Sequence, residues 1–120
     1  MRPDVILRFE WVCVFLAAIA GYALADGSWP LFFLLILSPD LSMLGYLAGP
    51  RIGAIAYNVF HTLIWPACLL VAGLFAGHML ALEIATIWLA HIAMDRALGY
   101  GLKLPTGFTD THLGRIGRGG

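Results

Sequence analysis

Four side chains that could bind a metal or transfer protons lie inside otherwise apolar segments: Asp40, His61, His91 and Asp95. Imidazole nitrogens and carboxylate oxygens are suitable ligands for zinc, manganese or iron. A divalent ion held by such groups makes a coordinated water acidic enough to serve as a hydrolytic nucleophile near neutral pH. The same groups could instead relay protons, because histidine titrates near neutrality.

Two further polar residues, Glu10 and Asn58, accompany this set. Asn58 precedes His61 by three positions, so the two share one side of a helix, as do His91 and Asp95 at a spacing of four. We expect Glu10 and Asn58 to support catalysis, by orienting the ligands or by acting as general base.

The elements that must position these residues are membrane-spanning helices. Of the 120 residues, 61% are hydrophobic and 12% are charged, and the mean hydropathy is +0.88. A spanning helix needs roughly 20 apolar residues. Runs of that length cover residues 5–25, 29–48, 52–74 and 79–98. The sequence therefore predicts a single all-α domain over 1–120, an integral membrane four-helix bundle in contact with the lipid bilayer.

The second span contains the sequence Ser38-Pro39-Asp40. A serine cap followed by proline is a helix-start signal, so we expect this span to be kinked or broken near Pro39. Residues 99–120 are polar and rich in glycine, and we expect a cytoplasmic tail. The sequence allows two interpretations of that tail. It is a solvated segment, or it folds over the cytoplasmic side of the site with Phe108 as an apolar plug.

Charge predicts the orientation. With four crossings, all seven Lys and Arg residues fall on the side of the N-terminus: Arg2, Arg8, Arg51, Arg96, Lys103, Arg115 and Arg118. Positive charge is retained in the cytoplasm, so both ends are expected inside. The first hundred residues contain no basic block, which argues against nucleic-acid binding.

Three of the polar residues are predicted to lie at a similar depth in the membrane. Asp40 lies ten residues before Pro50, His61 ten residues after Arg51, and His91 eight residues before Gly99. At the rise of an α-helix, all three sit roughly 12–15 Å from the cytoplasmic face. Because ionisable groups inside a membrane are costly and tend to mark function, their shared depth predicts one intramembrane polar site.

Several stretches of the sequence look like motifs of a protein family: Pro39 to Tyr46, Tyr57 to His61, His91 to Lys103, and Gly107-Phe108 with Thr111 to Gly114. In these phrases the chain resembles the bacterial integral-membrane family known as domain of unknown function 4260. The resemblance covers nearly the whole chain. It implies a multi-pass protein of the bacterial inner (cytoplasmic) membrane and supplies no activity.

The order of a Pro-Asp phrase, a helix with His, and then His-x-x-x-Asp is also similar to the predicted inner-membrane metal-dependent hydrolases. That resemblance implies Asp40, His61, His91 and Asp95 as metal ligands. The chain departs from the pattern at Asn58, which stands where a second histidine of a pair is expected.

Three interpretations follow. The leading one is a cytoplasm-facing divalent-metal site with hydrolase-like chemistry on a lipid or another membrane-associated substrate. The second is a non-enzymatic accessory subunit that packs against other subunits of a larger membrane complex. The third is a small homo-oligomeric transporter with a proton relay. The sequence leaves open which of these applies, and with it whether the protein is an enzyme.

The topology is testable with reporter fusions. A reporter fused after Gly120 should be active only in the cytoplasm, because all seven basic residues are on that side. A reporter inserted near Gly77 should behave as periplasmic. A C-terminal fusion that is active outside would contradict the four-span topology.

Overall fold

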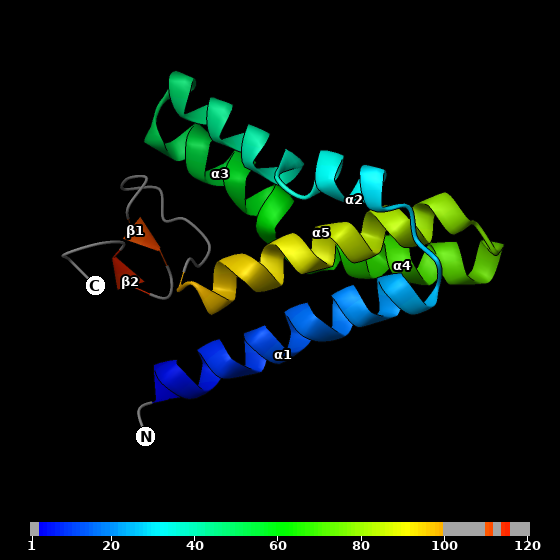
Figure 1. Cartoon of the computed structure of the whole chain (residues 1–120). Coiled ribbons are helices and arrows are strands. Elements are labelled where there is room, and N and C mark those ends of the chain that lie inside the picture. The colour runs from blue at the N-terminus through cyan, green and yellow to red at the C-terminus, as the bar shows by residue number, and fades with distance from the viewer. Residues whose placement is uncertain (1–2, 100–109, 112–113, 116–120) are drawn as a thin grey trace.

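The computed structural model describes residues 3–99, 110–111 and 114–115. The fold is all-α apart from one two-residue hairpin (Figure 1). The helices are α1 (Pro3–Leu24), α2 (Trp29–Leu35), the 3₁₀ helix η1 (Ser38–Ala48), α3 (Pro50–His61), α4 (Ile64–Ala76) and α5 (Met79–Ala97). The hairpin pairs β1 (Asp110–Thr111) with β2 (Gly114–Arg115) in antiparallel fashion. Phe108 and most of the predicted tail lie outside the described residues.

Three segments of the described chain are long and apolar enough to cross a membrane: Pro3–Leu24, Trp29–Ala48 and Pro50–Ala76. They match the first three predicted spans. The fourth, α5, has 19 residues and contains Glu83, Asp95 and Arg96. This helix packs against α1, α4 and α2. Its charged C-terminal turn is buried, with Asp95 and Arg96 in contact with α3. A helix covered by its neighbours can contain polar groups that would be costly against lipid.

The second span is broken where the sequence predicts. The α-helix ends at Leu35, and a 3₁₀ helix begins at Ser38, with Pro39 in its first turn. The Ser38 hydroxyl donates to the Leu35 carbonyl at 2.8 Å and occupies one acceptor at the end of α2. The prediction of a break near Pro39 is therefore confirmed.

The third span is also broken, which the sequence analysis did not predict. Thr62 has extended backbone angles (φ −87°, ψ 146°) between α3 and α4. The cause is Pro66, which lacks an N–H and whose ring would clash with the carbonyl four residues earlier in a continuous helix. Residue 62 is that position, so the helix ends at His61 and a new one begins at Ile64.

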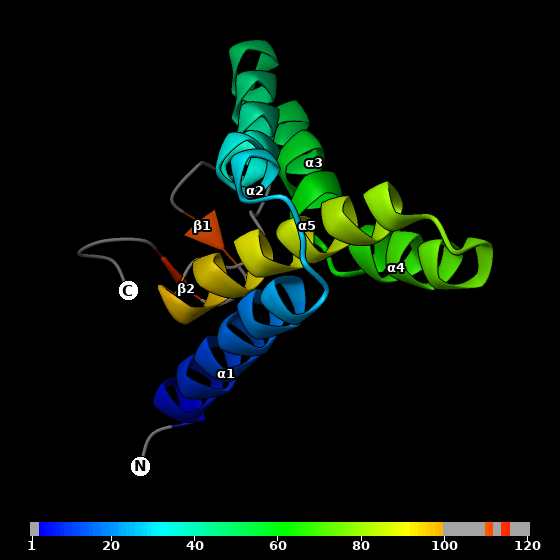
Figure 2. The ribbon, with the colours of Figure 1, turned by 45° about the vertical axis from the view of Figure 1, so that its right-hand side comes forward.

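Two packing units meet along α5. Ala18 and Tyr22 of α1, Phe32 of α2, and Ile87 and Ala90 of α5 form a buried core cluster. Helices η1 and α3 pack on each other and diverge from α1 and α4, so the helices do not lie parallel in one regular bundle (Figure 2). The two pairs of helices separate at the breaks in the second and third spans, between α2 and η1 and between α3 and α4.

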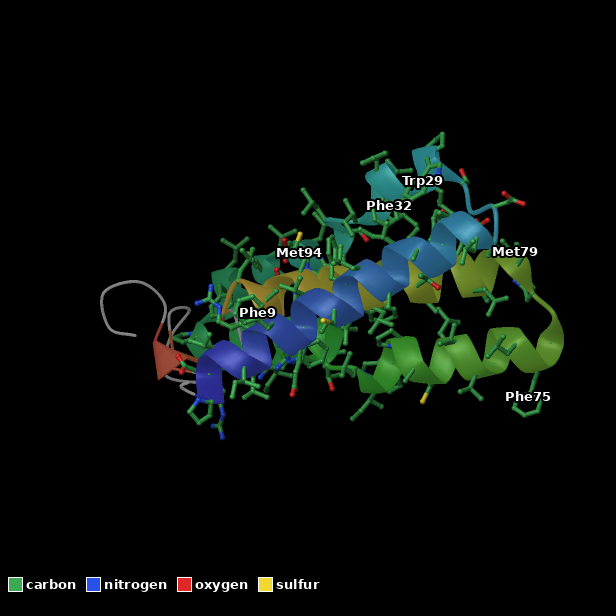
Figure 3. The ribbon with its side chains drawn as sticks, turned by 60° about the horizontal axis from the view of Figure 1, so that its bottom comes forward. Phe9, Trp29, Phe32, Phe75, Met79 and Met94 are labelled. Atoms are coloured by element: carbon green, nitrogen blue, oxygen red, sulfur yellow. The ribbon has the colours of Figure 1, made fainter. Side chains whose placement is uncertain are left out.

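Large apolar side chains cover the outside of the helices. Phe9 of α1 is 62% exposed and Phe75 of α4 is 90% exposed, and both project from the helices (Figure 3). A soluble protein rarely exposes so much apolar surface, whereas in a bilayer it contacts lipid chains. The surface and the three long apolar segments together indicate a membrane protein.

The contact between η1 and α3 depends on Gly53. A Cβ atom at this position would lie 2.3 Å from the ring of Tyr46, whereas a Cβ at Gly21 of α1 would have no atom within 4 Å. We expect Gly53→Ala to lower the free energy of unfolding by about 1–3 kcal/mol through overpacking. The matched Gly21→Ala should leave it unchanged or raise it by about 0.4–1 kcal/mol.

Thermal unfolding of both variants in the same detergent, followed by circular dichroism, measures the difference. Equal melting temperatures would show that η1 does not pack against α3 as described.

Candidate metal centre

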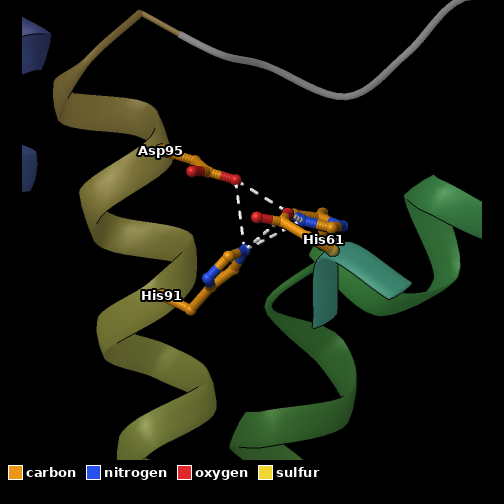
Figure 4. A group of neighbouring side chains, drawn as sticks. His61, His91 and Asp95 are labelled. Atoms are coloured by element: carbon orange, nitrogen blue, oxygen red, sulfur yellow. Dashed lines mark hydrogen bonds and ion pairs between the residues drawn. The ribbon is translucent and has the colours of Figure 1, made fainter. Parts of the chain in front are cut away.

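Four side chains from three helices converge on one point (Figure 4). Asp40 lies in the first turn of η1, His61 is the last residue of α3, and His91 and Asp95 lie one turn apart on α5. One potential ligand atom of each lies within 4.8 Å of those of the other three. The structure therefore brings together all four predicted metal ligands.

The two imidazole rings face each other through their Nε2 atoms, which are 3.0 Å apart. Each Nε2 lies 3.1 Å from Oδ1 of Asp40. The distances to Oδ2 of Asp95 are 3.4 Å from His61 and 3.3 Å from His91. A tetrahedral ion with ligands at roughly 2.0–2.2 Å separates its ligand atoms by roughly 3.3–3.6 Å. These five distances are close to that spacing.

The other nitrogen of each ring is bound to the backbone. His61 donates from Nδ1 to the carbonyl of Tyr57 at 2.8 Å, and His91 donates from Nδ1 to the carbonyl of Ile36 at 2.6 Å. A carbonyl can only accept, so both Nδ1 atoms must have a hydrogen. In the neutral rings both Nε2 atoms then direct a lone pair at the cluster, which is the tautomer that metal-binding histidines adopt.

The break in the second span supplies the carbonyl that His91 binds. The Asp40 amide bonds to the Leu37 carbonyl at 3.0 Å, as in a 3₁₀ turn, and so leaves the Ile36 carbonyl to His91. At the second break, the guanidinium of Arg96 donates to the His61 carbonyl at 3.1 Å. Broken helices inside membranes are tolerated where protein covers the released backbone groups, as it does at both positions.

Access to the cluster is uneven. His91 and His61 are 0% and 2% exposed, and the side chain of Asp95 is 11% exposed. The side chain of Asp40 is 33% exposed. Burying two carboxylates is costly unless positive charge accompanies them. Asp40 is therefore the most exposed member of the cluster.

The sequence analysis missed two residues of the site. The Tyr57 ring stacks on the His61 ring, with centroids 3.7 Å apart and planes at 7°, and its hydroxyl donates to Oδ2 of Asp95 at 3.4 Å. The spacing of four between Tyr57 and His61 is the signal that could have found it. Arg96 is buried and lies over the Trp11 ring at 5.8 Å. Its role in holding the second break had no signal in the sequence.

The two residues expected to act in catalysis lie outside the group of four. Glu10 is exposed on α1, and Asn58 is half-buried on α3, beside Tyr57 in sequence. The roles of both as orienting groups or general bases remain predictions.

The comparison with protein families gives one match. The family model described as Domain of unknown function (DUF4260) matches residues 4–116. The chain belongs to this family, and the resemblance found in its sequence is confirmed. Neither the curated proteins nor the solved structures give a match.

Two substitutions at Tyr57 separate the contributions of ring stacking and of the hydroxyl hydrogen bond to the free energy of unfolding. Tyr57→Phe keeps the ring on His61 and removes only the hydroxyl, so we expect a loss of about 0.5–1.5 kcal/mol in the free energy of unfolding. Tyr57→Ala removes the buried ring and should cost about 3–5 kcal/mol. Denaturation in mixed micelles measures both, and similar losses for the two variants would contradict the stacked arrangement.

Proposed function

We propose that this protein binds one divalent metal ion at Asp40, His61, His91 and Asp95 and uses it to hydrolyse an ester of a lipid or another membrane-associated substrate. The observation that carries the proposal is the chemistry of the converging atoms. With both Nδ1 atoms donating to carbonyls and both imidazoles neutral, the converging atoms are two nitrogen lone pairs and two carboxylate oxygens. Four acceptors at this spacing require a positive charge among them.

Zinc fits this donor set best among zinc, manganese and iron. Two imidazoles and carboxylate oxygen are common zinc ligands, and the five distances given above are close to the tetrahedral spacing that zinc prefers. In catalytic zinc sites three protein ligands are typical, and a fourth position is open to water or substrate. His61, His91 and Asp95 are the three buried ligands here, and the more exposed Asp40 stands at the open side.

The residues divide the chemistry between them. When bound, the divalent ion supplies a Lewis acid that makes water acidic near neutral pH. Asp40 would be the ligand that water or substrate displaces, and its freed carboxylate would accept the proton that the attacking water loses as its oxygen bonds to the ester carbon or phosphorus. The bond to the leaving oxygen breaks, and Asp40 returns the proton to that oxygen. The products are an acid and an alcohol.

We further propose that the protein crosses the bacterial inner membrane four times, with α5 as the fourth span and both ends in the cytoplasm. Supporting this, the start of α1, the turn between η1 and α3, and the end of α5 lie toward one end of the molecule (Figure 1). Arg8 of α1 donates from Nε to the Ala97 carbonyl of α5 at 2.8 Å, which joins two of these ends. The metal centre then opens toward the cytoplasm.

Metal analysis of the detergent-purified full chain tests the proposal. The wild type should retain about one zinc ion per chain, and loss of a ligand in His91→Ala or Asp95→Asn should lower retention by more than about tenfold. His78→Asn is the matched histidine control, because His78 caps α5 far along the helix from the cluster and asparagine also caps helices. Asp26→Asn in the α1–α2 turn is the matched aspartate control.

Both controls should retain metal at the wild-type level. A folded wild type that binds no zinc, manganese or iron would overturn the proposal. A shared proton between the two imidazoles would then account for their 3.0 Å contact, and the proton-relay interpretation would replace it. No observation on the described residues favours the accessory-subunit interpretation.

A further inference from the structure

An apolar pocket of about 280 Å³ adjoins the metal centre. Its lining includes residues that precede the proposed ligands on all three helices. Pro39 precedes Asp40, Phe60 precedes His61, and the α5 residues lie one to two turns before His91. The lining apart from Ser38 is Leu35, Pro39, Phe60, Ile84, Ile87 and Trp88.

The few polar groups of this lining are already occupied. The Ser38 hydroxyl donates to the Leu35 carbonyl at 2.8 Å, and the Trp88 indole donates from Nε1 to the Phe60 carbonyl at 2.6 Å. The pocket therefore presents hydrocarbon and aromatic surface to its occupant. The volume is at the lower end of the range for small-ligand sites, roughly 300–1,000 Å³. It suits one hydrocarbon chain and is too small for a whole lipid.

The direction of the pocket matches a lipid of the cytoplasmic leaflet. Ile84 lies seven residues before His91, which is roughly 10 Å along α5 toward its N-terminal end. In the proposed topology that end is the periplasmic one. A chain that enters the pocket from the metal centre thus points away from the cytoplasm and into the bilayer, as the chains of that leaflet do.

We propose that this pocket binds one hydrocarbon chain of a cytoplasmic-leaflet lipid and places the ester of its head group at the metal centre. The assignment of the head group rests on the proposed function. The assignment of the leaflet rests on the proposed topology, and the binding of a hydrocarbon chain rests on the pocket.

Photocrosslinking tests the chain site. The full chain is reconstituted in nanodiscs that contain phosphatidylethanolamine with a diazirine midway along one acyl chain, and adducts are mapped by mass spectrometry. In the wild type, adducts should concentrate on Phe60 and Ile84 to Trp88 relative to Phe75, which is far more exposed to bulk lipid. Ile84→Trp fills the pocket and should lower the pocket adducts several-fold.

The matched control is Leu80→Trp, one turn earlier on α5, where the side chain is 50% exposed and does not line the pocket. It should leave the pocket adducts unchanged. Adducts spread in proportion to exposure, or adducts insensitive to Ile84→Trp, would overturn the chain site and show only bulk lipid contact.

The metal content of the same samples separates the two proposals. Ile84→Trp should keep its metal, and His91→Ala should lose metal while pocket labelling persists. Pocket labelling in a wild type that binds no metal would overturn the proposed function and the assignment of the head group, and would support the chain site. Metal retention without pocket labelling would overturn the chain site alone.

Discussion

Two hydrogen bonds from imidazole Nδ1 to backbone carbonyls determine the chemistry of the candidate site. They fix the tautomers of His61 and His91 and turn both Nε2 lone pairs toward two carboxylates. Because the Nδ1 hydrogens bond to backbone carbonyls, they do not reach the carboxylates. The negative charge of Asp40 and Asp95 must therefore be balanced inside the cluster. A divalent ion would balance this charge, and so would a proton shared by the two imidazoles.

The irregular parts of the helices serve this arrangement. In a regular α-helix each carbonyl accepts from the amide four residues later, so continuous spans would engage the carbonyls of Ile36 and His61 in the helix. The breaks at Pro39 and before Pro66 release these carbonyls, and His91 and Arg96 of α5 bind them. Discontinuous helices that line a buried polar site are a recurring solution in membrane proteins, since released backbone groups must find partners there.

The position of α5 explains how the molecule tolerates its charges. Asp95 and Arg96 would be costly on a helix that faces lipid. Here both are buried, Asp95 against α3 and Arg96 between α3 and Trp11 of α1, and the exposed apolar side chains belong mainly to the other helices. The polar cluster and the apolar pocket consequently lie side by side around one central helix, which is the combination that an amphiphilic substrate requires.

The sequence by itself determined the all-α class, the three long apolar segments, the break at Pro39 and the four residues of the cluster, because hydropathy, proline and depth along a helix are local properties. The tertiary structure decided the rest. Tyr57 and Arg96 join the site through contacts between helices. Pro66 breaks the third span, which the uniformly apolar composition of that span did not indicate. Glu10, which we expected to support catalysis, lies exposed on α1, because position along a helix does not specify which way a side chain faces.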